Sequence, residues 1–186
     1  MKRTNIDIII ASFLVLIVVS GRVLNAKLGM PNFMPIAAVS LFSAAILKDK
    51  RALALLIPIL GQFLADVYFQ FFTNTPGFYD LAGQSFNYVA IICAGLLGLT
   101  MKQPKALNVL GYTVGASLIF FAVSNFGYYA GGWNGYGISG LTKTYIDAVP
   151  FYKNSFASDM VGSVLLFGGY MIAQQALAKK SLQAKA

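Results

Sequence analysis

The chain contains no histidine and no glutamate, and its six acidic residues are all aspartates. Histidine and the carboxylates provide most general bases and many metal ligands, so this composition removes much of the chemistry that enzymes use. The single cysteine, Cys93, excludes an intramolecular disulfide and a cysteine-based zinc site. The sequence shows no nucleophile with a base, no carboxylate pair at a fixed spacing and no phosphate-binding glycine loop. We therefore expect a protein that is not an enzyme and that holds no metal or cofactor.

Charged residues are also scarce, since they make up 11% of the 186 residues, whereas hydrophobic residues make up 58%. Several apolar runs reach or approach the ~20 residues that a helix needs to cross a bilayer. The net charge of +8 could indicate nucleic acid, but the basic residues lie at the ends of apolar runs rather than in one patch. We therefore expect a polytopic membrane protein that is embedded in lipid and has no nucleic-acid partner.

The order of apolar runs and polar breaks predicts an all-α membrane protein, with residues 1–186 forming a single integral membrane domain. The pattern predicts six transmembrane helices, near residues 8–24, 35–47, 52–72, 85–101, 107–124 and 160–178. The second is short and rich in Ala and Ser, which are small residues that allow close contact between helices. The first follows a basic start, as a signal peptide does, but its apolar run exceeds the roughly 7–15 residues typical of one. We therefore interpret it as a retained span.

Lysine and arginine collect on one side of these predicted spans. With a cytoplasmic N-terminus, ten of the fourteen fall on the inner side: Lys2, Arg3, Lys48, Lys50, Arg51, Lys102, Lys105, Lys179, Lys180 and Lys185. This bias follows the positive-inside rule and places both termini in the cytoplasm. Tyrosine and phenylalanine concentrate instead near the outer ends of the spans. We interpret them as part of an outward-facing aromatic and polar basin, with an interfacial aromatic belt as the alternative.

The stretch 125–159 separates the last two predicted spans and is too long to be a simple connection. It is dense in aromatic residues, which a disordered linker would not carry, and in glycines that suit tight turns. We therefore expect an ordered loop between the fifth and sixth helices that forms a cap over the outer end of the bundle. Within this cap, we expect Pro150 to define a turn and Asp159 to cap the start of the sixth span.

Polar and aromatic residues near the outer ends of the spans are the candidate substrate-binding residues: Arg22, Asn32, Asp66, Asn125, Trp133, Tyr145 and Asn154. Asp66 lies inside a predicted span, where a carboxylate is costly unless it is paired or faces a polar cavity. Arg22 is its expected partner, and a paired Asp66 could still line a pocket. Asn125 could instead pin the start of the cap, and Trp133 could anchor at the lipid headgroups rather than stack on a ligand. We expect Cys93 to be a small hydrophobe, with soft-metal ligation as the less favoured alternative.

Several stretches together resemble a family of small bacterial membrane proteins that is described only as transport proteins. They are Arg22, PNFMPIAAVSLF, the proline and Asp66 of the third span, FFAVSNF, and the block from GL through AVPF to Asp159. That family in turn resembles the substrate-binding S components of energy-coupling factor transporters. The resemblance implies six membrane helices, a location in the bacterial cytoplasmic (inner) membrane and a vitamin-like micronutrient bound near the outer face. It also implies docking to a transmembrane coupling subunit that is driven by ATPases.

We therefore expect a multi-pass membrane protein that binds or transports a small micronutrient, as an S component does. The alternative is a structural or accessory subunit of an inner-membrane complex, with the aromatic outer loop as its protein interface. A solitary transporter that acts without a coupling module is a further option that the sequence leaves open.

Overall fold

The computed structural model describes residues 3–74, 77–78 and 81–183, and within them the regular elements are all helices. They are α1 (Arg3–Leu28), α2 (Ile36–Ile46), the short 3-10 helix η1 (Lys48–Lys50), α3 (Arg51–Phe72), α4 (Leu81–Thr100), α5 (Ala106–Ala130) and α6 (Gly137–Gln183). The prediction of an all-α chain is therefore confirmed for this part. Lys2 and Lys185 of the predicted charge pattern lie outside the described residues.

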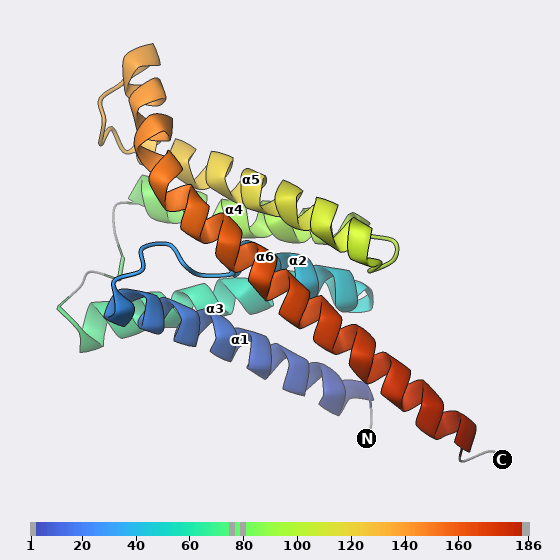
Figure 1. The fold of residues 1–186 in the computed structure, drawn as a ribbon. Helices are drawn as coiled ribbons and strands as arrows, with labels where there is room; N and C mark the ends of the chain where they lie inside the picture. Colours follow the sequence, from blue (N-terminus) through green and yellow to red (C-terminus); the bar gives the residue numbers. More distant parts are fainter. Residues whose placement is uncertain (1–2, 75–76, 79–80, 184–186) are drawn as a thin grey trace.

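The helices form a bundle with α2 at its centre. Helix α1 packs along α3, α4 packs along α5, and α6 crosses over α2 (Figure 1). Helix α2 contacts each of the other five α-helices. The start of α1 and the end of α6 lie at one end of the bundle, while the α1–α2 loop and the α5–α6 connection lie at the other (Figure 1). We call the latter the loop end.

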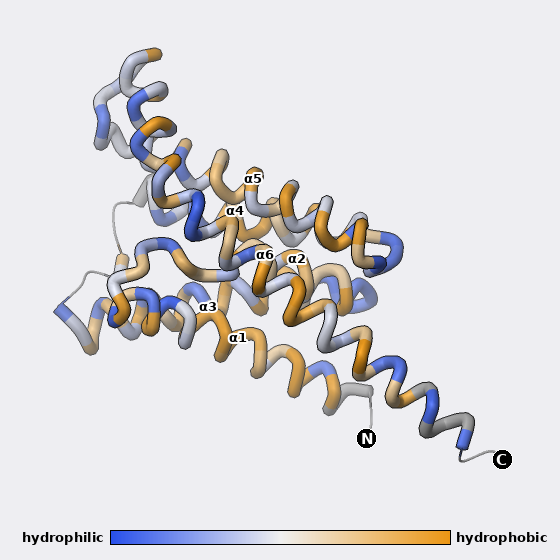
Figure 2. Tube along the Cα trace, in the orientation of Figure 1, coloured by the Kyte–Doolittle hydropathy of each residue, from blue (hydrophilic) through white to orange (hydrophobic). Residues whose placement is uncertain are grey.

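Five helical segments among the described residues are long and apolar enough to cross a membrane: 6–28, 48–72, 83–100, 106–130 and 137–177. By length and composition the chain is therefore a multi-pass membrane protein. Figure 2 shows apolar residues along the middle of these helices and hydrophilic residues toward several of their ends. Helix α2 is apolar but has only 11 residues, which rise about 16 Å against a hydrocarbon core of about 30 Å. The predicted second span therefore does not cross a bilayer unaided.

Small residues let α2 sit in the middle of the bundle. Its residues from Ile36 to Ala44 are all buried, and the Ser43 hydroxyl donates to the Ala54 carbonyl of α3 at 2.8 Å. A Cβ atom added at Gly98 of α4 would lie 2.5 Å from the Leu41 carbonyl oxygen. The Ala and Ser residues thus provide the expected close helix contacts, but they do so inside the chain rather than on a surface open to another subunit.

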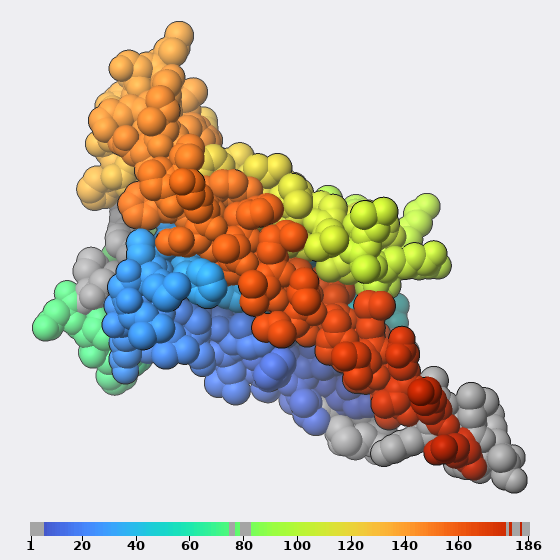
Figure 3. All heavy atoms as spheres, viewed as in Figure 1, coloured from blue at the N-terminus to red at the C-terminus, as the bar shows by residue number. Residues whose placement is uncertain are grey.

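The prediction of a loop cap over residues 125–159 is wrong. Helix α5 continues to Ala130 and α6 begins at Gly137, so only residues 131–136 connect them. Gly132, Gly135 and Gly137 have φ values of 76°, 79° and 76°, which only glycine adopts readily, and they form this tight connection. Helices α5 and α6 thus form a hairpin, and its tip, made of the connection and the first turns of α6, projects past the neighbouring helices (orange in Figures 1 and 3).

Two further expectations for this stretch are also wrong, because residues 137–159 are helical. Pro150 lies inside α6 rather than in a turn, and Asp159 lies well within the helix rather than at its N-cap. The first turns of α6 run in a different direction from the rest of the helix (Figure 1). A proline removes one backbone hydrogen bond and crowds the preceding turn, so Pro150 is the physical cause of such a bend.

Candidate functional site

A cavity of about 870 Å³ lies at the loop end of the bundle. Its walls come from all six α-helices, including α2 through Ile36, together with the α1–α2 loop and the α5–α6 connection. Small-molecule sites typically have volumes of about 300–1,000 Å³ and combine apolar or aromatic walls with a few polar groups. This cavity has both, since Phe120, Phe121 and Tyr152 line it beside Arg22 and Asn87.

Four of the predicted site residues line this cavity: Arg22, Asn32, Asn125 and Trp133. The other three, Asp66, Tyr145 and Asn154, are not part of its walls. Each of these three instead makes a hydrogen bond that holds part of the wall in place, as follows.

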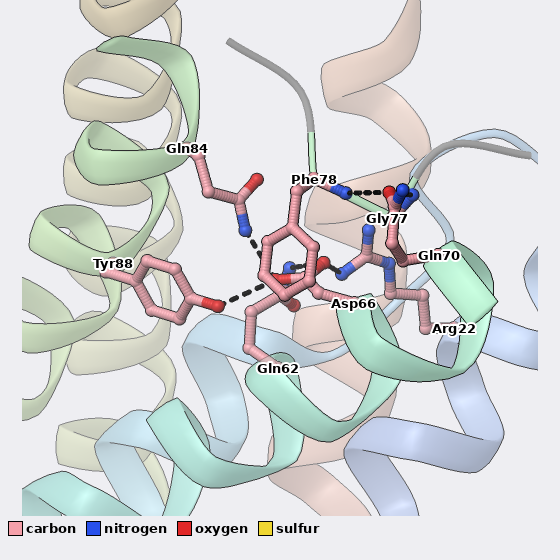
Figure 4. A network of polar contacts seen from close by, with 8 residues as sticks. All are labelled: Arg22, Gln62, Asp66, Gln70, Gly77, Phe78, Gln84 and Tyr88. Atoms are coloured by element: carbon pink, nitrogen blue, oxygen red, sulfur yellow. Dashed lines mark hydrogen bonds and ion pairs between the residues drawn. The ribbon is translucent and has the colours of Figure 1, made fainter. Parts of the chain in front are cut away.

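Asp66 is fully buried between α1, α3 and α4, and its carboxylate accepts hydrogen bonds on both oxygens (Figure 4). Oδ1 accepts from Arg22 of α1 and, at 3.4 Å, from Gln62 of α3. Oδ2 accepts from the amide of Gln84 and, at 2.7 Å, from the hydroxyl of Tyr88, both on α4. The predicted ion pair with Arg22 is therefore confirmed. The remaining partners complete a buried network that joins three helices.

Arg22 links this network to the cavity. Its side chain is 14% exposed, and its guanidinium carbon lies 5.4 Å from the centre of the Phe69 ring. A cation over an aromatic face and against a carboxylate is well stabilised even away from water. Asp66 thus orients Arg22 and neutralises its charge from behind the cavity wall.

The α1–α2 loop forms another part of the wall, and α6 holds it in place. The Asn154 side-chain amide donates to the Pro31 carbonyl at 2.9 Å, and the Ser155 hydroxyl donates to the Asn32 carbonyl at 3.1 Å. Asn32 has a φ of 60°, a left-handed conformation that asparagine tolerates better than most residues. Asn154 therefore positions the loop that carries Asn32.

The α5–α6 hairpin holds the remaining predicted residues. Asn125 lines the cavity and donates its side-chain amide to the Phe121 carbonyl of its own helix at 2.8 Å. Tyr145 donates its hydroxyl to the Ala122 carbonyl at 2.6 Å and so ties α6 to α5. Trp133 stacks on Tyr128 with ring centres 5.5 Å apart, and 57% of its surface is exposed. Trp133 is thus a partly open aromatic platform at the rim.

Sequence reasoning missed two carboxylates of the cavity wall, those of Asp147 and Asp159, of which Asp159 is the buried one. Its exposed fraction is 1%, and its Oδ1 atom accepts a hydrogen bond from the Ala38 amide of α2 at 3.0 Å. Ser117 and the Ala37 amide lie beside the same carboxylate. A helical signal was present, because Thr144, Ala148, Tyr152, Ser155 and Asp159 recur every three or four residues and all line the cavity. Treating residues 125–159 as a loop concealed this periodicity.

Neither Cys93 nor any acidic cluster forms a metal site in the part of the chain that the structure describes. No group of three or more His, Cys, Asp or Glu side chains there is close enough to hold a metal ion. Cys93 lies half-buried in α4 and forms no disulfide.

Sequence comparison assigns the chain to a family. Residues 2–182 match the model of a family of unknown function, DUF6580. The chain belongs to this family. Searches of curated proteins and of solved structures find no match. DUF6580 carries no described activity, and none of these comparisons links the chain to the S components of energy-coupling factor transporters.

Proposed function

We propose that this DUF6580 protein binds a small molecule in the cavity at the loop end of its bundle and serves in its uptake across a bacterial cytoplasmic membrane. The observation that carries the proposal is the cavity of about 870 Å³, with walls from six helices and a loop that α6 holds in place. Polar and charged groups inside a membrane protein are costly unless they are paired or serve a ligand or pathway, and aromatic faces beside them are typical of small-molecule sites.

The proposed ligand is a vitamin-like micronutrient, because this volume suits a molecule of that size and the walls combine aromatic faces with polar groups. The positive-inside pattern supports an outward-facing loop end, where such a nutrient would enter. Energy would come from an ion gradient or from a transmembrane coupling subunit with ATPases. In the latter case the docking surface has to lie elsewhere than on α2, which is buried.

The direct test is mass spectrometry of the gently extracted protein, with identification of small molecules that are released on denaturation. We expect a stoichiometric ligand in the wild type. Trp133→Ala should lower its retention about 3–10-fold, which corresponds to the loss of about 0.5–1.5 kcal/mol of aromatic stacking. Tyr136→Ala is the matched control, because Tyr136 is an exposed aromatic of the same connection outside the cavity wall. Equal retention in both variants would refute the assignment of the cavity.

A second candidate function is an accessory subunit of a membrane complex that docks through the hairpin tip. It is favoured by the exposure of apolar residues there, where Tyr136 and Ile138 are 72% and 86% exposed. A protein that purifies without a ligand but with other membrane subunits, and loses them on Ile138→Asp, would support this function instead.

A further inference from the structure

The charged groups that line the cavity, taken together with their ion-pair partners, do not balance. Arg22 is neutralised by Asp66, and Asp147 of the cavity wall pairs with Lys143 at 2.6 Å. Asp159 also lines the wall, yet it forms no ion pair with a lysine or arginine of the described residues. Among these groups, two cations face three aspartates, which leaves one negative charge at Asp159.

The local surroundings compensate this charge only in part. Asp159 is 1% exposed and accepts a hydrogen bond from the Ala38 amide in the first turn of α2, with the Ala37 amide and the Ser117 hydroxyl beside it. A helix N-terminus acts as roughly half of a positive charge, so it stabilises the carboxylate without neutralising it. A carboxylate buried in this way normally acquires a cationic partner or takes up a proton.

A second polar group of the cavity wall, the Gln62 side chain, contains an acceptor that lacks a donor. The Oε1 atom of Gln62 is buried and has no hydrogen-bond partner, while its Nε2 atom lies 3.4 Å from Asp66. Gln62 itself is only 6% exposed and lines the cavity. Buried acceptors without donors are rare in proteins and mark places where a missing partner belongs. Gln62 therefore lacks a donor, whereas Asp159 lacks a cationic partner among the described residues. A positively charged N–H group would supply both.

We propose that the ligand of this cavity carries a positively charged nitrogen that donates hydrogen bonds, and that Asp159 receives it. The inference rests on the proposed function, since it names the chemical class of that ligand. Phe120, Phe121 and Tyr152 line the same cavity and offer aromatic faces that attract cations. Arg22 does not provide a comparable binding site for an anion, because Asp66 already neutralises its charge.

The competing explanation is that Asp159 serves only to cap α2. The two roles separate in Asp159→Asn, because the asparagine side chain keeps an oxygen that can accept from the Ala38 amide but carries no charge. The test therefore measures the electrostatic potential of the cavity and needs no knowledge of the natural ligand.

In a Cys93→Ala background, Ser155→Cys places a thiol on the cavity wall one helical turn before Asp159. The rate of thiol modification is measured with two methanethiosulfonate reagents, the permanently cationic trimethylammonium-ethyl reagent and the permanently anionic sulfonatoethyl reagent. Each rate is divided by the rate of the same reagent with a small free thiol, and the cationic value is then divided by the anionic value to give one ratio. We expect the cationic reagent to be favoured at least about tenfold, because a unit charge acts strongly at short range in a poorly hydrated site. Asp159→Asn should bring the ratio close to one. Asp7→Asn removes the same charge at the opposite end of the bundle and should leave the ratio unchanged.

Equal rates in the parent protein would mean that Asp159 carries a proton instead of a charge, and would overturn the proposal. A preference that persists in Asp159→Asn would overturn it too, by locating the charge elsewhere. The parent measurement leaves Asp159 untouched, so it decides even if the variant does not fold. A co-purified ligand without a cationic nitrogen would refute this inference and leave the proposed function intact. Failure of the proposed function would show instead as a protein that retains no small molecule although its cavity attracts the cationic reagent.

Discussion

Removing the positive charge of Arg22 is expected to destabilise the protein severely. Asp66 is fully buried, and Arg22 is its one cationic partner among the described residues. Arg22→Gln would leave the carboxylate with the neutral donors Gln62, Gln84 and Tyr88. Breaking a buried ion pair from one side costs about 3–5 kcal/mol, because the remaining charge stays buried without compensation.

The other changes in this network should cost less, and in a defined order. Asp66→Asn leaves the Arg22 charge, which is 14% exposed and faces Phe69, so we expect a loss of about 1.5–3 kcal/mol. The double variant Arg22→Gln with Asp66→Asn contains no unpaired charge. Its loss should therefore be smaller than the sum of the single losses, by about 1–3 kcal/mol.

The assay is reversible unfolding in mixed micelles with increasing SDS, followed by far-UV circular dichroism and extrapolated to the free energy of unfolding. Lys143→Gln is the matched control, because it breaks an exposed lysine–aspartate pair within α6, which contributes about 0.3–0.5 kcal/mol. The reasoning fails if Arg22→Gln costs no more than this control. It also fails if the two single losses add without coupling, since the pair would then not act as one buried unit.

Three further predictions concern packing, the pinned loop and orientation. Gly98→Ala should lower the free energy of unfolding by about 1–3 kcal/mol through overpacking against α2. The control Gly168→Ala, with no atom within 4 Å of the added carbon, should be neutral or stabilising. Equal effects of the two variants on unfolding in micelles would contradict the close α2–α4 contact. Asn154→Ala removes the hydrogen bond to the α1–α2 loop. It should speed amide hydrogen exchange in that loop about fivefold, which corresponds to roughly 1 kcal/mol. An unchanged exchange rate would contradict the role of Asn154 in holding the loop in place. Tyr136 and Gln103 are exposed at opposite ends of the bundle. In a cysteine-free background, an impermeant maleimide should therefore label Tyr136→Cys on intact cells and Gln103→Cys only after the cells are permeabilised. The reverse labelling pattern would mean that the proposed topology is inverted.

Much of the fold follows from composition and periodicity. Apolar runs with basic ends predicted the long helices, and a carboxylate inside one of them predicted the ion pair of Asp66 with Arg22. The helical hairpin was missed because aromatic residues and glycines suit turns as well as helices. Residues 137–159 are helical with few strong helix formers, so packing against α5 and the α1–α2 loop overrides weak local preference.

The candidate site was predictable only in part, where residue type and position along a span were sufficient. Arg22, Asn32, Asn125 and Trp133 were identified by residue type and by position near the outer ends of the spans, and they line the cavity. Asp159 was not identified, because an Asp before an apolar run is an N-cap if the helix starts there and a side chain within the helix if the helix starts earlier. In this structure it lies within the helix and is buried. Which of these it becomes depends on how far upstream α6 begins.

Local chemistry alone therefore determines that this chain is helical, with helices long and apolar enough to cross a membrane, and it predicts on which side the positive charge lies. Hydropathy and charge are properties of short segments, and a bilayer responds to them directly. The burial of α2, the formation of the cavity and the burial of Asp159 without an ion pair among the described residues were decided by tertiary structure. Each depends on residues that are far apart in the sequence and meet only when helices pack, as when Ala38 donates to Asp159 across 121 positions.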